Sequence, residues 1–298
     1  MSDFRLKVFR SVAKNLSFTK ASQELFVGQP AITKHIQELE AAYQTRLFDR
    51  QGSRISLTES GNLLLEHCER ILEDYKRLEY EMHLLHNEYT GGLKLGASTT
   101  IAQYVLPPLL ASFIGKFPQV SLSLLNGNSR EIEAALQEHR IDLGFVEGVF
   151  RLPNIRYTTF LEDELVAVVR TGSKLAVGEE ITPDELFHLP LVLRERGSGT
   201  LDVFERALQQ HNIKLSSLQV LMYLGSTESI KLFLEHTDCL GIVSVRSITR
   251  ELYSGQLRVV EIKGMPMLRD FSFAQPQGQE SGLAQVFMQF AMHNNHKL

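Results

Sequence analysis

The sequence predicts a mixed α+β and α/β protein in three parts: a winged helix-turn-helix over residues 1–58, a linker helix over 59–90, and a two-lobed α/β region over 91–298. Three observations predict this division. The first part combines helical apolar patterns with a basic hairpin, the second repeats apolar residues every seven positions, and the third alternates short apolar runs with amphipathic helices. A chain of 298 residues, 43% hydrophobic and 22% charged, is typical of a folded protein with several domains.

The helix expected after Gly28 has one apolar and one polar face. Its apolar face is formed by residues spaced three or four apart, Ile32, Ile36, Leu39 and Tyr43. Pro30 fits the first turn, where its missing N–H is not needed. The polar face carries side chains that can donate to phosphates or pair with base edges in a major groove: Gln29, Thr33, Lys34 and Gln37.

A shorter helix is expected before this one, with Thr19 as its N-cap and a turn at Val27 and Gly28. Downstream, the basic tip at residues 50–54 lies between two apolar runs, the pattern of a hairpin wing whose arginines reach phosphates or a minor groove. Residues 1–58 hold nine Lys or Arg and five Asp or Glu, net +4 on a chain of net −4. The sequence therefore predicts a DNA-binding module that uses Thr19, Gly28, Gln29, Pro30, Thr33, Lys34, Gln37, Arg50, Ser53 and Arg54.

These residues also carry a family resemblance. The segments SFTKAS, VGQPAITKHIQELE, RLFDR and LTESG follow in the order and spacing found in LysR-type transcriptional regulators, and the chain resembles a full-length member. Gly28 stands where the family usually has Ser, which gives a weaker helix cap, and Ser22 replaces a common Ala. Neither departure alters the surface expected to face DNA. The alternative for residues 1–58 is a small helical packing domain.

The linker predicts a dimer. Two apolar sets recur every seven residues, Leu64, Ile71, Leu78 and Leu85 in one and Cys68, Tyr75, Met82 and Tyr89 in the other. They fit the a and d positions of a coiled coil, which Thr90, Gly91 and Gly92 would end. A two-fold homodimer would present two recognition helices to related half-sites, and the resemblance implies homotetramers built from such dimers. The alternative is a long helix packed on its own domain.

Residues 91–298 predict two α/β lobes with a mostly parallel sheet. Strands are expected at 93–97, 120–125, 142–146, 165–169, 191–193, 240–243 and 271–273, and helices at 102–116, 129–139, from 200, and at 282–293, with a capping box at 182–185. Lobe I is assigned residues 91–162 and 267–298, and lobe II residues 163–266. The double crossover makes a cleft, and the arrangement resembles the periplasmic-binding-protein-like effector domain of the LysR family.

Two helix starts in this half offer hydroxyls and free backbone N–H groups, at residues 98–100 and 197–200. Both follow expected strands, so they could face each other across the cleft and hold an anion. Glu147 would repel an anion but pair with an amine, which favours a small carboxylate, anionic or amino-acid-like effector. The resemblance assigns effector contacts to the same positions, and the full predicted set is Ser98, Thr99, Thr100, Gln103, Glu147, Arg194, Ser198, Gly199 and Thr200.

The loop at residues 194–200 also resembles that of regulators of sulfur and cysteine metabolism. Helix-start hydroxyls on their own are as often simple caps as ligand contacts.

Several function classes lack support in the sequence. Clean matches to GxSxG, a P-loop, HExxH and GxGxxG are absent, so we expect no enzyme, no cofactor and no metal. Cys68 and Cys239 are too few for a disulfide framework, and we expect both to be reduced and buried. Without a long apolar run or a secretory layout, the expected location is the cytoplasm and no membrane partner is expected. A ligand-responsive regulator of double-stranded promoter DNA fits best, and a cytoplasmic solute-binding or enzymatic α/β domain with a regulatory DNA-binding arm is the alternative.

Overall fold

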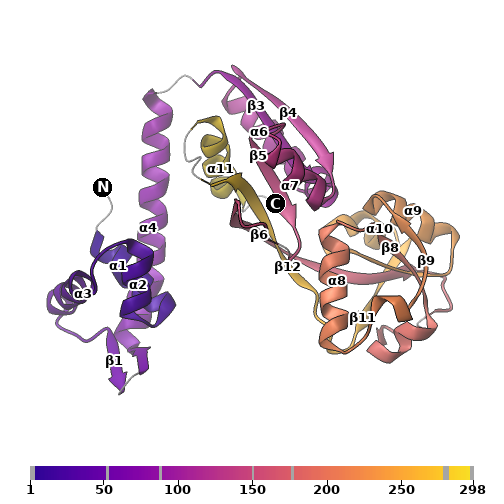
Figure 1. Ribbon diagram of the computed structural model, residues 1–298, viewed down its shortest axis with the longest axis horizontal. Helices are drawn as coiled ribbons and strands as arrows, with labels where there is room; N and C mark the ends of the chain where they lie inside the picture. Colours follow the sequence, from indigo (N-terminus) through magenta and orange to yellow (C-terminus); the bar gives the residue numbers. More distant parts are fainter. Residues whose placement is uncertain are drawn as a thin grey trace. The chain divides into compact units, whose positions relative to one another are not determined.

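The computed structural model describes residues 4–51, 54–86, 89–149, 151–175, 178–277 and 282–295. The chain forms two compact units, Met1–Glu88 and Tyr89–Leu298 (Figure 1). Among the described helices, none combines the length and apolar character needed to cross a bilayer.

The first unit contains three helices, a two-stranded wing and a long helix: α1 (Phe4–Asn15), α2 (Phe18–Leu25), α3 (Gln29–Tyr43), β1 (Phe48–Gln51), β2 (Arg54–Leu57) and α4 (Glu59–His86). Ile32, Ile36 and Leu39 of α3 are buried in the shared core, as their spacing predicts. The prediction for Tyr43 is wrong, since its side chain is 55% exposed. Tyr43 is the last residue of α3, and Gln44 turns the chain toward the wing with a φ of 51°.

Helix α2 begins earlier than expected. Its N-cap is Ser17, whose Oγ accepts a hydrogen bond from the Lys20 N–H at 3.2 Å. The expectation that Thr19 is the cap is therefore wrong, because Thr19 already lies inside the helix. Phe26 ends α2 in the left-handed region (φ 53°), and Gly28 then begins α3 without a side-chain cap bond, as expected of a glycine.

The first half of α4 packs against its own unit. Cys68 and Leu72 are buried in the core, Leu64 packs against it, and the Cys68 Sγ donates to the Leu6 carbonyl at 3.3 Å. The assignment of Cys68 to a coiled-coil seam is therefore wrong. The alternative, a helix packed on its own domain, holds for this half of α4.

Elsewhere on α4, three apolar residues of the predicted seam are exposed. Ile71, Leu78 and Met82 are 40%, 50% and 48% exposed, so these seam residues are not buried within the unit. The side chain of Leu85 lies outside the described residues, and Tyr89 lies beyond the end of α4, where its ring packs on Phe117. Helix pairing through the exposed residues stays a prediction.

The second unit holds a ten-stranded sheet among the residues that the structure describes. Its strands are β3 (Gly91–Ser98), β4 (Val120–Gly127), β5 (Leu143–Glu147), β6 (Ile155–Arg170), β7 (Glu180–Ile181), β8 (Pro190–Arg194), β9 (Gln219–Leu224), β10 (Leu240–Ser244), β11 (Leu257–Ile262) and β12 (Leu268–Pro276). Its helices are α5 (Thr99–Tyr104), α6 (Leu106–Lys116), α7 (Ser129–Gln137), η1 (Pro183–His188), α8 (Gly199–Gln210), η2 (Leu215–Ser217), α9 (Thr227–His236), η3 (Val245–Ser247), α10 (Thr249–Tyr253) and α11 (Leu283–Asn294).

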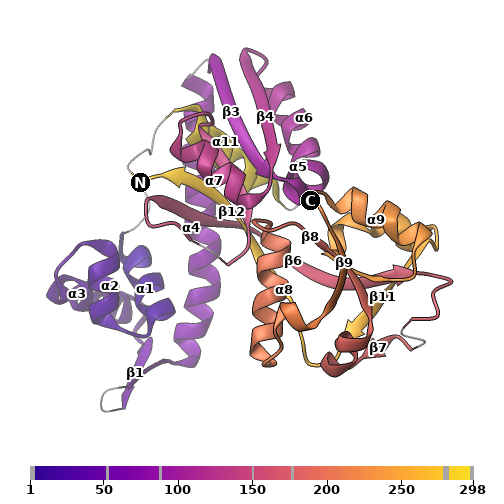
Figure 2. The ribbon, with the colours of Figure 1, turned by 45° about the vertical axis from the view of Figure 1, so that its right-hand side comes forward.

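Two long antiparallel strands join the lobes. In lobe I, β3 runs parallel to β4 and β5, and in lobe II, β8 runs parallel to β9 and β10. Strand β6 pairs with β12 from Ile155 to Glu164 and with β10 and β11 from Leu165 onward, so it passes from one lobe to the other beside β12 (Figure 2). The expected mostly parallel sheet holds within each lobe but not for these crossover strands. The lobe boundary assigned at residues 162–163 falls inside β6.

The helix expected at 102–116 is interrupted. Helix α5 begins at Thr99, the chain breaks at Val105 (φ −114°), and α6 then carries proline in its first turn. Because Pro107 and Pro108 have no N–H to donate, a continuous helix cannot run through them, whereas the first turn of a new helix accepts them. The break leaves α5 as a six-residue helix at the carboxyl end of β3.

Candidate functional site

The polar face of α3 is presented as predicted. The side chains of Gln29, Lys34 and Gln37 are exposed, and so is Pro30 in the first turn. Thr33 is half-buried, and its hydroxyl donates to the Gln29 carbonyl at 3.1 Å. The surface has the donors and acceptors needed to read base edges and phosphates.

Thr19 and the wing flank this surface. The exposed Thr19 hydroxyl donates to Gln29 Oε1 at 3.3 Å, which links α2 to the start of α3. The backbone of Arg50 pairs with Ile55, and that of Gln51 with Arg54, in the wing hairpin. Ser53 lies outside the described residues, as do the side chains of Arg50 and Arg54.

The predicted effector residues gather between the lobes. Ser98 ends β3, Thr99 and Thr100 begin α5, and Glu147 ends β5, all in lobe I. Lobe II contributes a second set from the end of β8 and the start of α8, Arg194, Ser198, Gly199 and Thr200. These residues are buried, whereas Gln103 is exposed. Both sets lie at the carboxyl ends of parallel strands, where open α/β sheets bind ligands.

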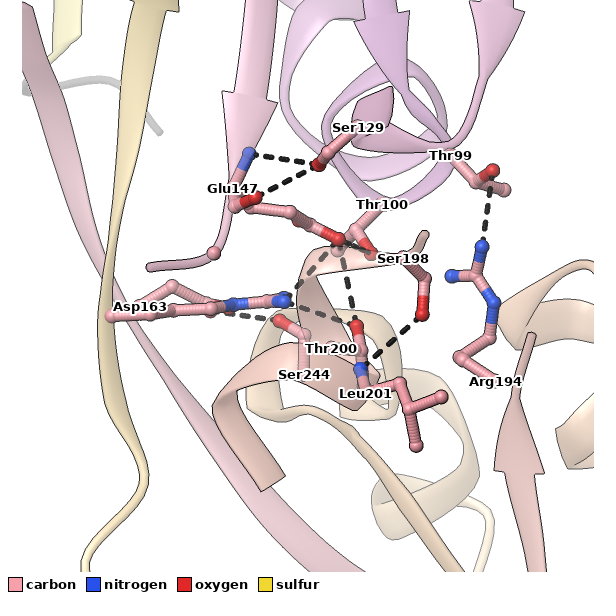
Figure 3. Close-up of polar contacts among 12 residues, drawn as sticks. Thr99, Thr100, Ser129, Glu147, Asp163, Arg194, Ser198, Thr200, Leu201 and Ser244 are labelled. Carbon is pink, nitrogen blue, oxygen red and sulfur yellow. Dashed lines mark hydrogen bonds and ion pairs between the residues drawn. The ribbon is translucent and has the colours of Figure 1, made fainter. Parts of the chain in front are cut away.

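Glu147 is surrounded by protein donors. Its Oε1 accepts from the hydroxyls of Thr100 at 3.3 Å and Thr200 at 3.5 Å (Figure 3). Arg269 Nη1 lies 3.2 Å from the same oxygen and 3.0 Å from the Thr200 hydroxyl. The backbone N–H of Glu147 donates to Ser129 Oγ at 3.2 Å. The carboxylate predicted to meet an effector amine is therefore already paired with an arginine of the chain itself, which it shares with Asp163.

Arg269 is the main functional residue that the sequence reasoning missed. It lies in β12 opposite Asp163 of β6, and its Nε donates to Asp163 Oδ2 at 2.7 Å. Ser244 donates to Asp163 Oδ1 at 2.7 Å, and Arg246 Nε lies 3.6 Å from that oxygen. The signal in the sequence was the charged pair Arg269-Asp270 between the apolar residues Leu268 and Phe271. Both carboxylates that flank Arg269 are buried. Glu147 belongs to lobe I and Asp163 to the assigned lobe II, so the charged groups Glu147, Arg269 and Asp163 connect the two lobes.

Arg194 makes a second link across the cleft. Its Nη2 donates to the Thr99 hydroxyl at 3.4 Å (Figure 3). The same nitrogen donates to the Gly225 carbonyl at 3.3 Å, and the Nε donates to Glu195 at 2.8 Å. Its Nη1 has no hydrogen-bond partner although it is buried, and the same is true of Ser98 Oγ. Glu147 Oε2 is a buried acceptor without a partner.

Gly199 has a packing role. A Cβ built on Gly199 would lie 2.2 Å from the Glu147 carbonyl oxygen, so any larger residue would push the start of α8 away from the end of β5. Gly148 follows with a φ of 108°, and a Cβ there would meet Gly199 Cα at 2.9 Å. The two glycines let the lobes touch, so the space expected beside Gly199 for a ligand is filled by lobe I backbone.

A second polar cluster surrounds Tyr157 of β6. The Tyr157 hydroxyl donates to Glu133 Oε1 at 2.6 Å, and Arg151 lies over the Tyr157 ring at 4.5 Å. Burial raises the pKa of Glu133 and that of Asp202, so both carboxyls titrate above their ordinary range. Among the described residues, no group of three or more His, Cys, Asp or Glu side chains is arranged to hold a metal ion.

Comparisons with known proteins agree with this architecture. Residues 4–62 match the model of the bacterial regulatory helix-turn-helix protein, lysR family, and residues 86–295 match the LysR substrate binding domain. The chain is 35% identical to the HTH-type transcriptional regulator YeiE of Escherichia coli K12, over 87% of this chain and 85% of that protein.

The chain is also similar to a second transcriptional regulator and to a solved regulatory domain. The HTH-type transcriptional regulator CysL of Bacillus subtilis is 28% identical over 90% of this chain and 89% of its own length. The Synechocystis PCC6803 CcmR regulatory domain, solved in complex with 2-PG, is 27% identical with a TM-score of 0.62, and the match covers 68% of this chain and 97% of that one. On its two domain matches and its identity to YeiE, this chain belongs to the LysR family of helix-turn-helix transcriptional regulators.

Proposed function

We propose that this LysR-family regulator binds promoter DNA through α3, Thr19 and the wing, and that a small anion held between its two lobes modulates that binding. The DNA contacts are those predicted from the sequence, led by Gln29, Lys34 and Gln37. The exposure of these three side chains on one face of α3 supports the assignment.

The proposal of a bound anion rests on two buried hydrogen-bond donors that have no partner. Ser98 Oγ and Arg194 Nη1 come from opposite lobes, and a buried donor left unpaired costs about 1–3 kcal/mol. One oxyanion that accepts from both would remove two such penalties. The start of α8 adds the positive end of a helix dipole on the lobe II side.

The same geometry changes the expected chemistry of the ligand. Glu147 already accepts hydrogen bonds from Thr100 and Thr200 and forms an ion pair with Arg269. The acid group of the effector is therefore expected to bind at Ser98 and Arg194. An amine is no longer needed to balance Glu147, although its free Oε2 could accept from one. A carboxylate, phosphate or sulfur oxyanion therefore fits best. The solved complex of the CcmR domain with 2-PG supports an anion of this class, and likeness to CysL keeps a sulfur-related role as a proposal.

We also propose that the protein works as a homodimer or homotetramer in the cytoplasm. Ile71, Leu78 and Met82 on α4 offer an exposed apolar row for helix pairing. The outer strands β4 and β9 add exposed apolar residues at opposite ends of the sheet, Leu124, Leu125, Leu221, Met222 and Tyr223. Such faces would bring two or more recognition helices to one promoter.

The test is DNA binding with and without anions. The affinity for the DNA upstream of its own gene is measured against a shuffled competitor at about 0.15 M salt, with 2-phosphoglycolate or inorganic sulfate added. We expect specific binding that one of these anions changes. Ser98→Ala and Arg194→Met should abolish the change while specific binding persists, and Arg206→Met, on the exposed side of α8, is the matched control. An unchanged response in both cleft variants would contradict the proposed anion site.

A further inference from the structure

The lobes make another contact, away from the anion residues. Tyr104 ends α5 in lobe I, and its hydroxyl donates to Glu228 Oε1 on α9 of lobe II. The ring of Tyr104 lies 5.2 Å from Lys231 Nζ, within the range of a cation–π contact. Figure 2 shows α5 beside α9 at this side of the second unit.

Glu228 is held in place by a buried lysine. Lys231 is 4% exposed, and its Nζ lies 2.7 Å from Glu228 Oε1, 2.8 Å from Glu251 Oε1 and 2.9 Å from the Ser247 carbonyl. With all three N–H donors used, the ammonium fixes Glu228 against η3 and α10. Tyr104 therefore bonds to a rigid acceptor.

The contact between Tyr104 and Glu228 is connected to the proposed anion-binding residues on both sides of the cleft. Tyr104 lies in the same six-residue helix as Thr99 and Thr100. On the lobe II side, Arg194 Nη2 donates to the Gly225 carbonyl, just before the Ser226 cap of α9. A shift of α5 relative to α9 would therefore move the Thr99 side of the cleft relative to Arg194.

We propose that Tyr104 is a positioning residue that clasps α5 to α9 and so sets the distance between the Ser98 and Arg194 donors of the anion site. The hydroxyl of Tyr104 makes the bond that holds the two helices together. Burial, followed by the hydrogen bond to Glu228, raises the pKa of Tyr104, so it stays a protonated donor to a carboxylate. The effect on anion affinity rests on the proposed function, whereas the clasp itself does not.

The chain offers a matched pair of variants. Tyr104→Phe keeps the ring over Lys231 but removes the bond between lobes. Tyr157→Phe removes a tyrosine–glutamate bond within lobe I, from Tyr157 to Glu133, and also the bond that the Tyr157 hydroxyl accepts from the Leu152 N–H. Amide hydrogen exchange of the intact protein reports local opening at α5 and α9, and calorimetric titration with 2-phosphoglycolate or sulfate reports anion affinity.

We expect Tyr104→Phe to speed exchange over residues 99–104 and 227–231 by about tenfold and to weaken binding of the anion that the wild type takes by about the same factor. Tyr157→Phe should leave both unchanged. Glu228→Leu removes the acceptor of this bond together with its ion pair to Lys231, so it should speed exchange at least as much, and Tyr104→Phe should add little to it.

Each outcome decides something. Unchanged exchange at α5 and α9 in both Tyr104→Phe and Glu228→Leu would overturn the proposed contact between the lobes. Faster exchange with unchanged anion affinity would overturn the positioning role. If the wild type binds neither anion, the proposed anion function fails for these ligands, while the exchange data still decide whether Tyr104 holds α5 to α9.

Discussion

Replacing Arg269 with methionine tests the chain of charges between the lobes. Arg269 is 1% exposed and lies between the carboxylates of Glu147 and Asp163, whose side chains are 1% and 0% exposed. Its nitrogens lie 3.2 Å from Glu147 Oε1 and 2.7 Å from Asp163 Oδ2. Methionine fills a similar volume but leaves both buried carboxylates without their main countercharge.

Removal of one partner from a buried ion pair costs about 3–5 kcal/mol, because the remaining charge is left desolvated. Asp163 keeps its bond from Ser244, and Glu147 keeps two hydroxyl donors, so the estimate is not doubled. We therefore expect Arg269→Met to lower the free energy of unfolding by about 3–5 kcal/mol.

Urea unfolding measures this loss as a shift of the midpoint at constant slope. The matched control is Arg140→Met. Its ion pair with Glu138 is equally short at 2.7 Å but 52% and 60% exposed, and it should contribute only about 0–1 kcal/mol. Adding Glu147→Gln and Asp163→Asn to Arg269→Met should recover most of the stability, since amides need no countercharge. A loss below about 1 kcal/mol for Arg269→Met alone would refute the reasoning.

Three further predictions concern other sites. Lys34→Ala should weaken binding to all DNA and reduce the salt slope by about 0.9, whereas Gln29→Ala should relax preference at one base step; equal losses on specific and shuffled DNA would contradict this. Burial raises the pKa of the Cys68 and Cys239 thiols to about 11, so at pH 8 only about one in a thousand is thiolate, and a thiol reagent should modify them only on unfolding. Gly199→Ala should lower the unfolding free energy by about 1–3 kcal/mol in urea, and an unchanged midpoint would exclude the predicted clash.

Structural features that depend on residues close together in the sequence could be predicted. The cap predicted at Thr182 is present, with Glu185 Oε2 accepting from the Thr182 N–H at 2.7 Å. The apolar spacing of Ile32, Ile36 and Leu39 identified the buried face of α3. Strands β3, β5, β8 and β10 were found because buried parallel strands read as continuous apolar runs.

Features set by distant pairing were missed. The first half of β6 is rich in polar residues and does not read as a buried run. Strand β9 does read as an apolar run over Val220–Leu224, yet three of these residues are exposed because β9 is the outer strand of the sheet. Arg269 and Asp163 are 106 residues apart, and only the register of β12 against β6 places them opposite each other. Cys68 fitted a heptad, yet the fold of its own unit buries it against Leu6. Local periodicity does not decide which surface a helix face meets.

The bonds between the lobes also limit how an effector can act. A ligand shifts an equilibrium only through bonds that it makes better in one arrangement than in the other. Arg194 bonds to Thr99 across the cleft, and Thr200 bonds to Glu147. With these bonds in place, Ser98 Oγ and Arg194 Nη1 are buried and have no hydrogen-bond partner. Under the proposed function, an anion that accepts from both donors gains its two bonds when the lobes are close, so we expect it to favour closure by the penalties that it removes.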